Sequence, residues 1–148
     1  TWQARGIRAW EEGWWDMPVR VGDLIGRIIG AGPGETVMHQ NVSVANALVL
    51  SCFDWTARRN KLVTDSLNFP SNLYQFHEHA GQGMRVVKVQ SPDGIHVPLE
   101  RLLEEIDEET ALVSISHVIF RSAFVQDVAA IVEKAHAVGA MVCADVYQ

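Results

Sequence analysis

The sequence lacks an apolar run close to the ~20 residues that a membrane-spanning helix needs. It also lacks a basic excess, with 12 Lys and Arg against 18 Asp and Glu and a net charge of −6. Nucleic-acid binding is therefore disfavoured. The two cysteines, Cys52 and Cys143, form no C-x-x-C pair and lie in apolar runs, which predicts buried free thiols. Nothing indicates an oxidising compartment, so we expect a cytoplasmic protein without membrane or nucleic-acid partners.

An initiator Met and a signal-peptide pattern are also missing. The chain starts Thr1-Trp2-Gln3, and we therefore expect it to lie inside a longer polypeptide. Its 148 residues are 48% hydrophobic and 20% charged, which is typical of one folded domain rather than a disordered chain.

Hydrophobic periodicity predicts an alternation of helices and strands. Helices are expected over 21–28, 44–53, 71–80, 98–106 and 127–135, and strands over 36–39, 61–66, 84–89, 111–116 and 140–144. The last strand is almost continuously apolar, which predicts burial of both its faces. Alternation of this kind indicates an α/β fold with a mostly parallel sheet flanked by helices. We divide the chain into a lead-in with a first helix, 1–34, and the sheet domain, 35–148.

Ligands of open α/β sheets bind at the carboxyl ends of the strands. Asp145 directly follows the apolar stretch 141–144, so its carboxylate should need a cationic or strongly donating partner. A helix cap or a structural ion pair is one interpretation. A protonated pyridine nitrogen is the alternative, because a carboxylate keeps such a ring cationic and able to accept electrons.

Two further strand-end segments carry a structural and a functional interpretation. Ser43 precedes a helix, where it could be an N-cap or could help to bind a phosphate. The stretch Phe69-Pro70-Ser71-Asn72 could be a turn with Ser71 or Asn72 as the cap, or Phe69 could offer its ring to a flat heteroaromatic ligand. No histidine pattern has metal-ligand spacing, and His77-Glu78-His79 is not the H-E-x-x-H zinc motif.

Taken together, these segments resemble kynureninases and, more broadly, the class V aminotransferase group of fold-type-I pyridoxal-phosphate (PLP) enzymes. The resemblance runs over nearly the whole chain. It rests on Val19-Arg20-Val21-Gly22-Asp23, Gly34-Glu35, Ser43-Val44, Phe69-Pro70-Ser71, Ser116-His117-Val118 and Asp145.

The resemblance implies a PLP site built from strand-end residues. Val42 and Ser43 would hold the phosphate, Phe69 would stack on the ring, Ser116 would contact the cofactor and Asp145 would pair with the pyridinium nitrogen. Asn72 and Gln148 would also face the cofactor, where kynureninases usually carry Asp and His. At the position of Gln148, a Gln resembles what other members of the group, such as cysteine desulfurases, carry there.

The lysine that binds the cofactor covalently follows the pyridinium Asp in this family. Lys61, Lys88 and Lys134 all precede Asp145, and we expect all three to be surface lysines. The resemblance therefore implies an incomplete large domain with no catalytic residue in this chain, with the lysine and the small domain beyond Gln148.

The implied function is hydrolysis of L-kynurenine to anthranilate and L-alanine by a homodimer. Alternatives within the group are transamination, desulfuration, and racemisation or epimerisation of an amino acid. A catalytically dead PLP-fold protein kept for binding is the alternative outside enzymes.

Overall fold

The computed structural model describes all residues, 1–148, and divides into two compact units, Thr1–Ala45 and Asn46–Gln148. No helix in either unit is long and apolar enough to cross a membrane. The functional division expected after residue 34 stays a prediction.

The first unit is helical and contains no strand. Its elements are α1 (Trp2–Arg5), η1 (Gly6–Ala9), η2 (Trp10–Trp14), α2 (Met17–Ile29) and the start of α3 (Val42–Ser51). Gly30 ends α2 in the left-handed conformation, with φ 78°. The helix expected over 21–28 is thus confirmed as part of a longer one.

The strand expected over 36–39 is wrong, because this segment is irregular and packs on α2 instead of a sheet. A Cβ atom on Gly22 would lie 2.0 Å from the carbonyl oxygen of Thr36, so only glycine permits this approach. Asp23 Oδ1 also accepts a hydrogen bond of 2.7 Å from the backbone N–H of Gly34. The segment therefore has no neighbouring strand to pair with.

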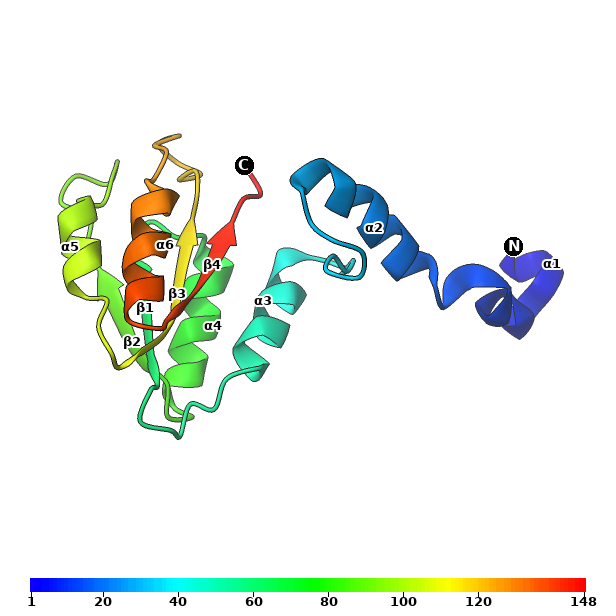
Figure 1. Ribbon diagram of the computed structural model, residues 1–148, viewed down its shortest axis with the longest axis horizontal. Coiled ribbons are helices and arrows are strands. Elements are labelled where there is room, and N and C mark those ends of the chain that lie inside the picture. The colour runs from blue at the N-terminus through cyan, green and yellow to red at the C-terminus, as the bar shows by residue number, and fades with distance from the viewer. The chain divides into compact units, whose positions relative to one another are not determined.

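The second unit is built on a parallel sheet, which confirms the predicted fold class (Figure 1). The strand order is β2-β1-β3-β4, and every neighbouring pair is parallel. The strands are β1 (Lys61–Asp65), β2 (Arg85–Val89), β3 (Thr110–Ser116) and β4 (Met141–Asp145). Because β1 and β3 lie inside the sheet, every residue of both strands is buried.

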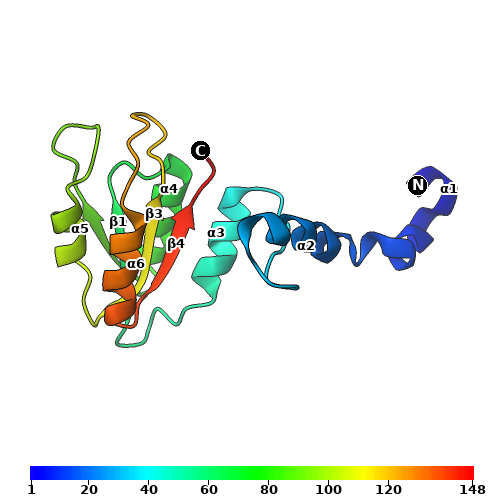
Figure 2. The same cartoon turned by 45° about the horizontal axis from the view of Figure 1, so that its top comes forward.

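Helices cover both faces of this sheet, as Figures 1 and 2 show from two directions. They are α4 (Pro70–Ala80), α5 (Leu99–Glu104) and α6 (Val128–Ala137), besides the second part of α3. One core cluster joins Val63 and Val113 to Leu102 of α5 and Ile131 of α6. The other joins Leu62 and Leu112 to Leu50 of α3 and Phe76 of α4. Neighbouring strand residues thus contribute to opposite cores, as the two-residue period of a strand requires.

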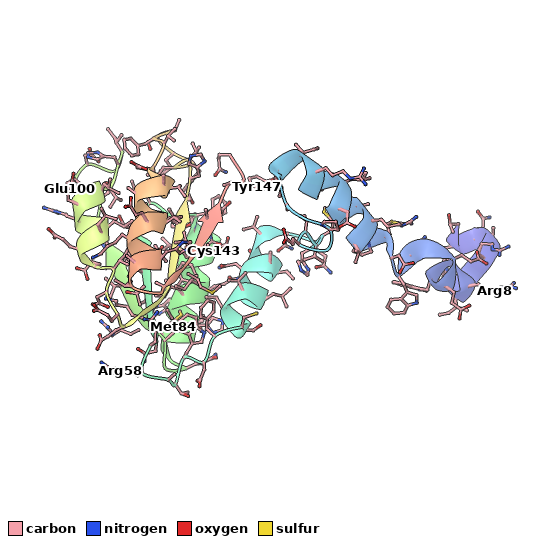
Figure 3. All side chains as sticks on the ribbon, in the orientation of Figure 1. Arg8, Arg58, Met84, Glu100, Cys143 and Tyr147 are labelled. Atoms are coloured by element: carbon pink, nitrogen blue, oxygen red, sulfur yellow. The ribbon has the colours of Figure 1, made fainter.

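The strand β4 forms an edge of the sheet, which corrects the expectation that both its faces are buried. Met141 is 63% exposed, and the next four residues are only partly buried. Figure 3 labels Cys143 on this strand, and the thiol is partly buried. Cys52 is exposed, so the prediction of a buried thiol is wrong there.

Candidate functional site

The carboxyl ends of β3 and β4 bring two of the predicted site residues together. Ser116 and Asp145 are register partners in the parallel pair, and the N–H of His117 donates a 2.8 Å hydrogen bond to the backbone oxygen of Asp145. Both side chains therefore stand at the edge where open α/β sheets bind ligands.

Asp145 presents a partly buried carboxylate with only weakly donating partners. Its Oδ1 accepts from the N–H of Tyr147 at 3.1 Å, and its Oδ2 accepts from Asn72 Nδ2 at 3.4 Å. No cation pairs with it within the chain. Within the chain Asp145 therefore takes part in no ion pair, and its interpretation as a helix cap stays a prediction. The carboxylate retains capacity for a further donor.

Asn72 lies in the first turn of α4 and is 3% exposed. Its Nδ2 donates to Asn68 Oδ1 at 3.1 Å and to Asp145 Oδ2. Its Oδ1 is buried and has no hydrogen-bond partner. Since buried polar atoms are almost always paired, this acceptor marks a place for an external donor. Phe69 is the N-cap of the helix and Pro70 its first residue, so neither Ser71 nor Asn72 is the cap.

Phe69, whose N–H donates to Asn68 Oδ1, has a side chain that is 41% exposed. Phe120, in the loop after β3, meets the Phe69 ring edge-on with 5.1 Å between centroids. The guanidinium of Arg121 lies 5.3 Å from the centroid of Phe120. A hollow of about 180 Å³ opens here, lined by residues that include Pro70, Phe120 and Arg121. The exposed part of the Phe69 ring is of a kind on which a flat ligand can stack.

Three residues under the site escaped the sequence-based prediction: Asp65, Asn68 and Gln126. Asp65 is fully buried at the end of β1, and burial raises the pKa of its carboxyl group. Hydrogen bonds from Gln126 Nε2, at 3.2 Å, and from the N–H of Leu67, at 2.8 Å, oppose that shift. Gln126 also donates to the backbone oxygen of Ser116 at 2.8 Å. An Asp as the last residue of an apolar strand was the available signal, and it equals the signal used for Asp145.

Val42 and Ser43 open α3 and belong to the first unit, so they are described only within it. Asn41 Oδ1 accepts from the N–H of Val44 at 2.9 Å, which makes Asn41 the cap of this helix and corrects the interpretation of Ser43 as the N-cap. Gln148 ends the chain and is exposed. The phosphate-binding and ring-facing roles of these residues stay predictions.

Lys61 is not a surface lysine as expected. It is 2% exposed and starts β1, at the amino end of the strand, where its Nζ lies 2.6 Å from Asp107 Oδ2. Lys88 is exposed and Lys134 partly buried. Lys61 is therefore held in an ion pair at the amino ends of the strands, whereas Asp145 lies at the carboxyl ends.

At the carboxyl ends of the strands, which we call the carboxyl edge, the side-chain oxygen atoms of the candidate site are mainly acceptors. They belong to Asn72, Ser116 and Asp145, and the Ser116 hydroxyl donates its hydrogen to Asn68 Oδ1 at 3.3 Å. Such a set suits a ligand that donates hydrogen bonds and carries positive charge, with an aromatic ring beside it in Phe69.

Two kynureninases are similar to this chain. The enzyme of Geobacillus thermodenitrificans is 28% identical over 150 residues, which cover 95% of this chain and 35% of the relative. That of Pseudomonas fluorescens is 32% identical over 144 residues, 91% of this chain and 33% of the relative. The chain thus spans about a third of the length of these curated relatives.

The fold is similar to that of a C-DES variant with glycine covalently linked to its PLP cofactor. The TM-score is 0.78 at 17% identity, over 99% of this chain and 40% of the other. The family model for class V aminotransferases matches residues 20–148. The chain therefore belongs to the class V aminotransferase family.

Proposed function

We propose that the full-length protein is a PLP-dependent, kynureninase-like hydrolase that cleaves L-kynurenine to anthranilate and L-alanine. The observation that carries this proposal is the pair of Asn72 and Asp145, with a buried acceptor and a carboxylate that both lack a strong donor. The kynureninases among the relatives support the choice of substrate.

The residues present fit a PLP ring. Its protonated nitrogen is a donor and a cation, which matches Asp145, and the buried Asn72 Oδ1 is a second acceptor that a donor could satisfy. The exposed face of Phe69 fits the flat ring. In this proposal Val42 and Ser43 hold the phosphate at the start of α3, and Gln148 lies near the ring.

When bound, PLP would supply an electron sink for negative charge that develops on the substrate. Asp145 would hold the proton on the ring nitrogen, because its carboxylate stabilises the cationic form. Ser116 and Asn72 would fix the orientation of the ring through their oxygen acceptors. The packing of Phe120 against Phe69 would hold that ring in place for stacking on the cofactor.

Asn72 and Gln148 favour a second candidate, another class V activity such as cysteine desulfuration. Asn carries no charge where kynureninases usually have Asp, and Gln does not protonate near neutral pH as His does. Both changes would alter the field around the cofactor.

The two activities are separated by assaying the purified full-length protein with PLP on two substrates. Release of fluorescent anthranilate from L-kynurenine supports the proposal, and the same assay without protein is the blank. Sulfide release from L-cysteine without anthranilate supports the second candidate. Saturable PLP binding without turnover of either substrate contradicts both kynurenine cleavage and cysteine desulfuration.

We also propose a cytoplasmic homodimer as the working form of the protein. Light scattering after size exclusion tests the oligomeric state, and a mass of one chain contradicts it.

A further inference from the structure

Asn68 lies at the centre of the polar groups beneath the candidate site and is 2% exposed. Its Nδ2 donates to Thr64 Oγ1 and to the backbone oxygen of Ser114, both at 3.0 Å. Its Oδ1 accepts from the N–H of Phe69 at 2.7 Å, besides the bonds from Asn72 and Ser116. One side chain thus connects β1, β3 and the start of α4.

These partners fix which way the amide of Asn68 points. The backbone oxygen of Ser114 can only accept, and the N–H of Phe69 can only donate. A flipped amide would place its oxygen against the backbone oxygen of Ser114 and its NH₂ group against the N–H of Phe69. In a buried position each lost pair costs more than the bond itself contributes, so a single orientation persists.

The orientation of Asn68 dictates that of its neighbours. Because Asn68 offers an oxygen, Asn72 must turn its NH₂ group toward it, and Ser116 must donate its only hydroxyl hydrogen. The second hydrogen of Asn72 Nδ2 goes to Asp145 Oδ2. What remains unpaired is Asn72 Oδ1, which is an acceptor. The Ser116 oxygen, whose hydrogen is used, can also act only as an acceptor.

We propose that Asn68 is a positioning residue that gives the carboxyl-edge site its acceptor character through Asn72 and Ser116. The site then selects a ligand that presents hydrogen-bond donors and a positive charge. Asn68 itself touches no ligand in this account. The identification of that ligand as PLP rests on the proposed function.

The test is a double-mutant cycle on PLP affinity, measured by visible absorption in the full-length protein. Asn68→Leu and Asn72→Leu should each weaken PLP binding about tenfold. Asn72→Leu removes an acceptor of the site, and Asn68→Leu removes the side chain that orients Asn72 and Ser116. If Asn68 acts through Asn72, the double variant binds about as weakly as either single variant. Losses that multiply to about a hundredfold would overturn the proposal, as would unchanged affinity in Asn68→Leu.

Asn60→Leu is the matched control. Asn60 precedes β1 at the amino edge of the sheet, and its Nδ2 donates to the backbone oxygen of Gly83 at 2.9 Å. It should lower the melting temperature and leave PLP affinity unchanged. A purely structural role of Asn68 would give that same result in Asn68→Leu. If Asn68→Leu does not fold, Asn68→Ala replaces it, because Ala also removes the Oδ1 acceptor and should weaken PLP binding to the same extent.

A second measurement needs neither variant nor PLP. Hydrogen exchange of side-chain amides in the wild-type protein should be much slower for Asn68 and Asn72 than for Asn60, since both NH₂ groups are buried and bonded. Fast exchange at Asn68 overturns the proposal. If the wild-type protein binds no PLP while this protection is observed, the proposed function fails and the assignment of Asn68 stands.

Discussion

Asn72 Nδ2 donates a hydrogen bond to Asp145 Oδ2, with 3.4 Å between the two atoms. The same NH₂ group donates to Asn68 Oδ1, so both of its hydrogens are used. An ionised carboxylate at position 72 could make neither bond, because it has no donor. The amide of Asn72 thus places a donor, and not a second carboxylate, next to Asp145.

Asn72→Asp should therefore make stability strongly dependent on pH. The new carboxylate would face Asp145 and an amide oxygen, which raises the pKa of the pair above the unfolded value of ~3.9. The native state then binds more protons than the unfolded state, so stability falls as pH rises through the raised pKa. Melting temperatures of the cofactor-free protein across pH 4 to 8 provide the measurement. Asn60→Asp is the control, and parallel curves for the two variants would contradict the argument.

Asp65 should impose a smaller pH dependence of the same sign in the wild-type protein. Burial raises the pKa of its carboxyl group, so stability is lost as pH rises from ~3.9 through the folded-state pKa. Asp65→Asn keeps an acceptor for the N–H of Leu67 and removes the titration. The melting temperature of the variant should rise relative to that of the wild type as pH increases. A difference that is constant with pH would show that Asp65 does not titrate in this range.

Phe69→Leu should weaken PLP binding about three- to tenfold, because an aromatic pair contributes about 0.5–1.5 kcal/mol beyond the buried area. Its melting temperature should change little, since the ring is 41% exposed. Phe53→Leu is the control. Phe53 stacks on Trp55, at 5.1 Å between centroids, and packs against the core cluster that contains Leu50. That variant should lose stability and keep its affinity for PLP. The reverse pattern would place Phe69 in the core rather than in the site.

Asp145→Ala should remove nearly all turnover of L-kynurenine while some PLP stays bound. A preorganised charge of this kind contributes roughly 3 kcal/mol to a barrier, so kcat should fall by about a hundredfold or more. Steady-state assays at saturating PLP measure the effect. Near-normal kcat in the variant would assign Asp145 a structural role.

Local sequence was enough to predict the α/β order and the position of Asp145 at the end of a strand. Short apolar stretches such as 111–116 predict strands, and the position of Asp145 after another such stretch, 141–144, predicts a carboxylate at the carboxyl ends of the strands. The segment 36–39 failed because a strand needs a neighbour, and Thr36 instead contacts Gly22 of α2. The two-residue alternation of apolar and polar side chains that predicts a strand does not indicate such a contact.

The groups under the site could not be predicted from local pattern, because their roles depend on distant residues. Asn68 is a turn residue in sequence, yet it binds Ser116, 48 positions away. Asp65 and Gln126 are 61 positions apart. Only the parallel register of β1, β3 and β4 brings these residues together.

Whether Asp145 and its neighbours form a cofactor site is measured by titrating the full-length protein with PLP and following the visible absorption. The wild-type protein should show a saturable change with a defined stoichiometry, and Asp145→Ala should need a higher PLP concentration to reach it. A protein that stays colourless after PLP is added, or an Asp145→Ala curve that superimposes on the wild-type curve, would contradict the account.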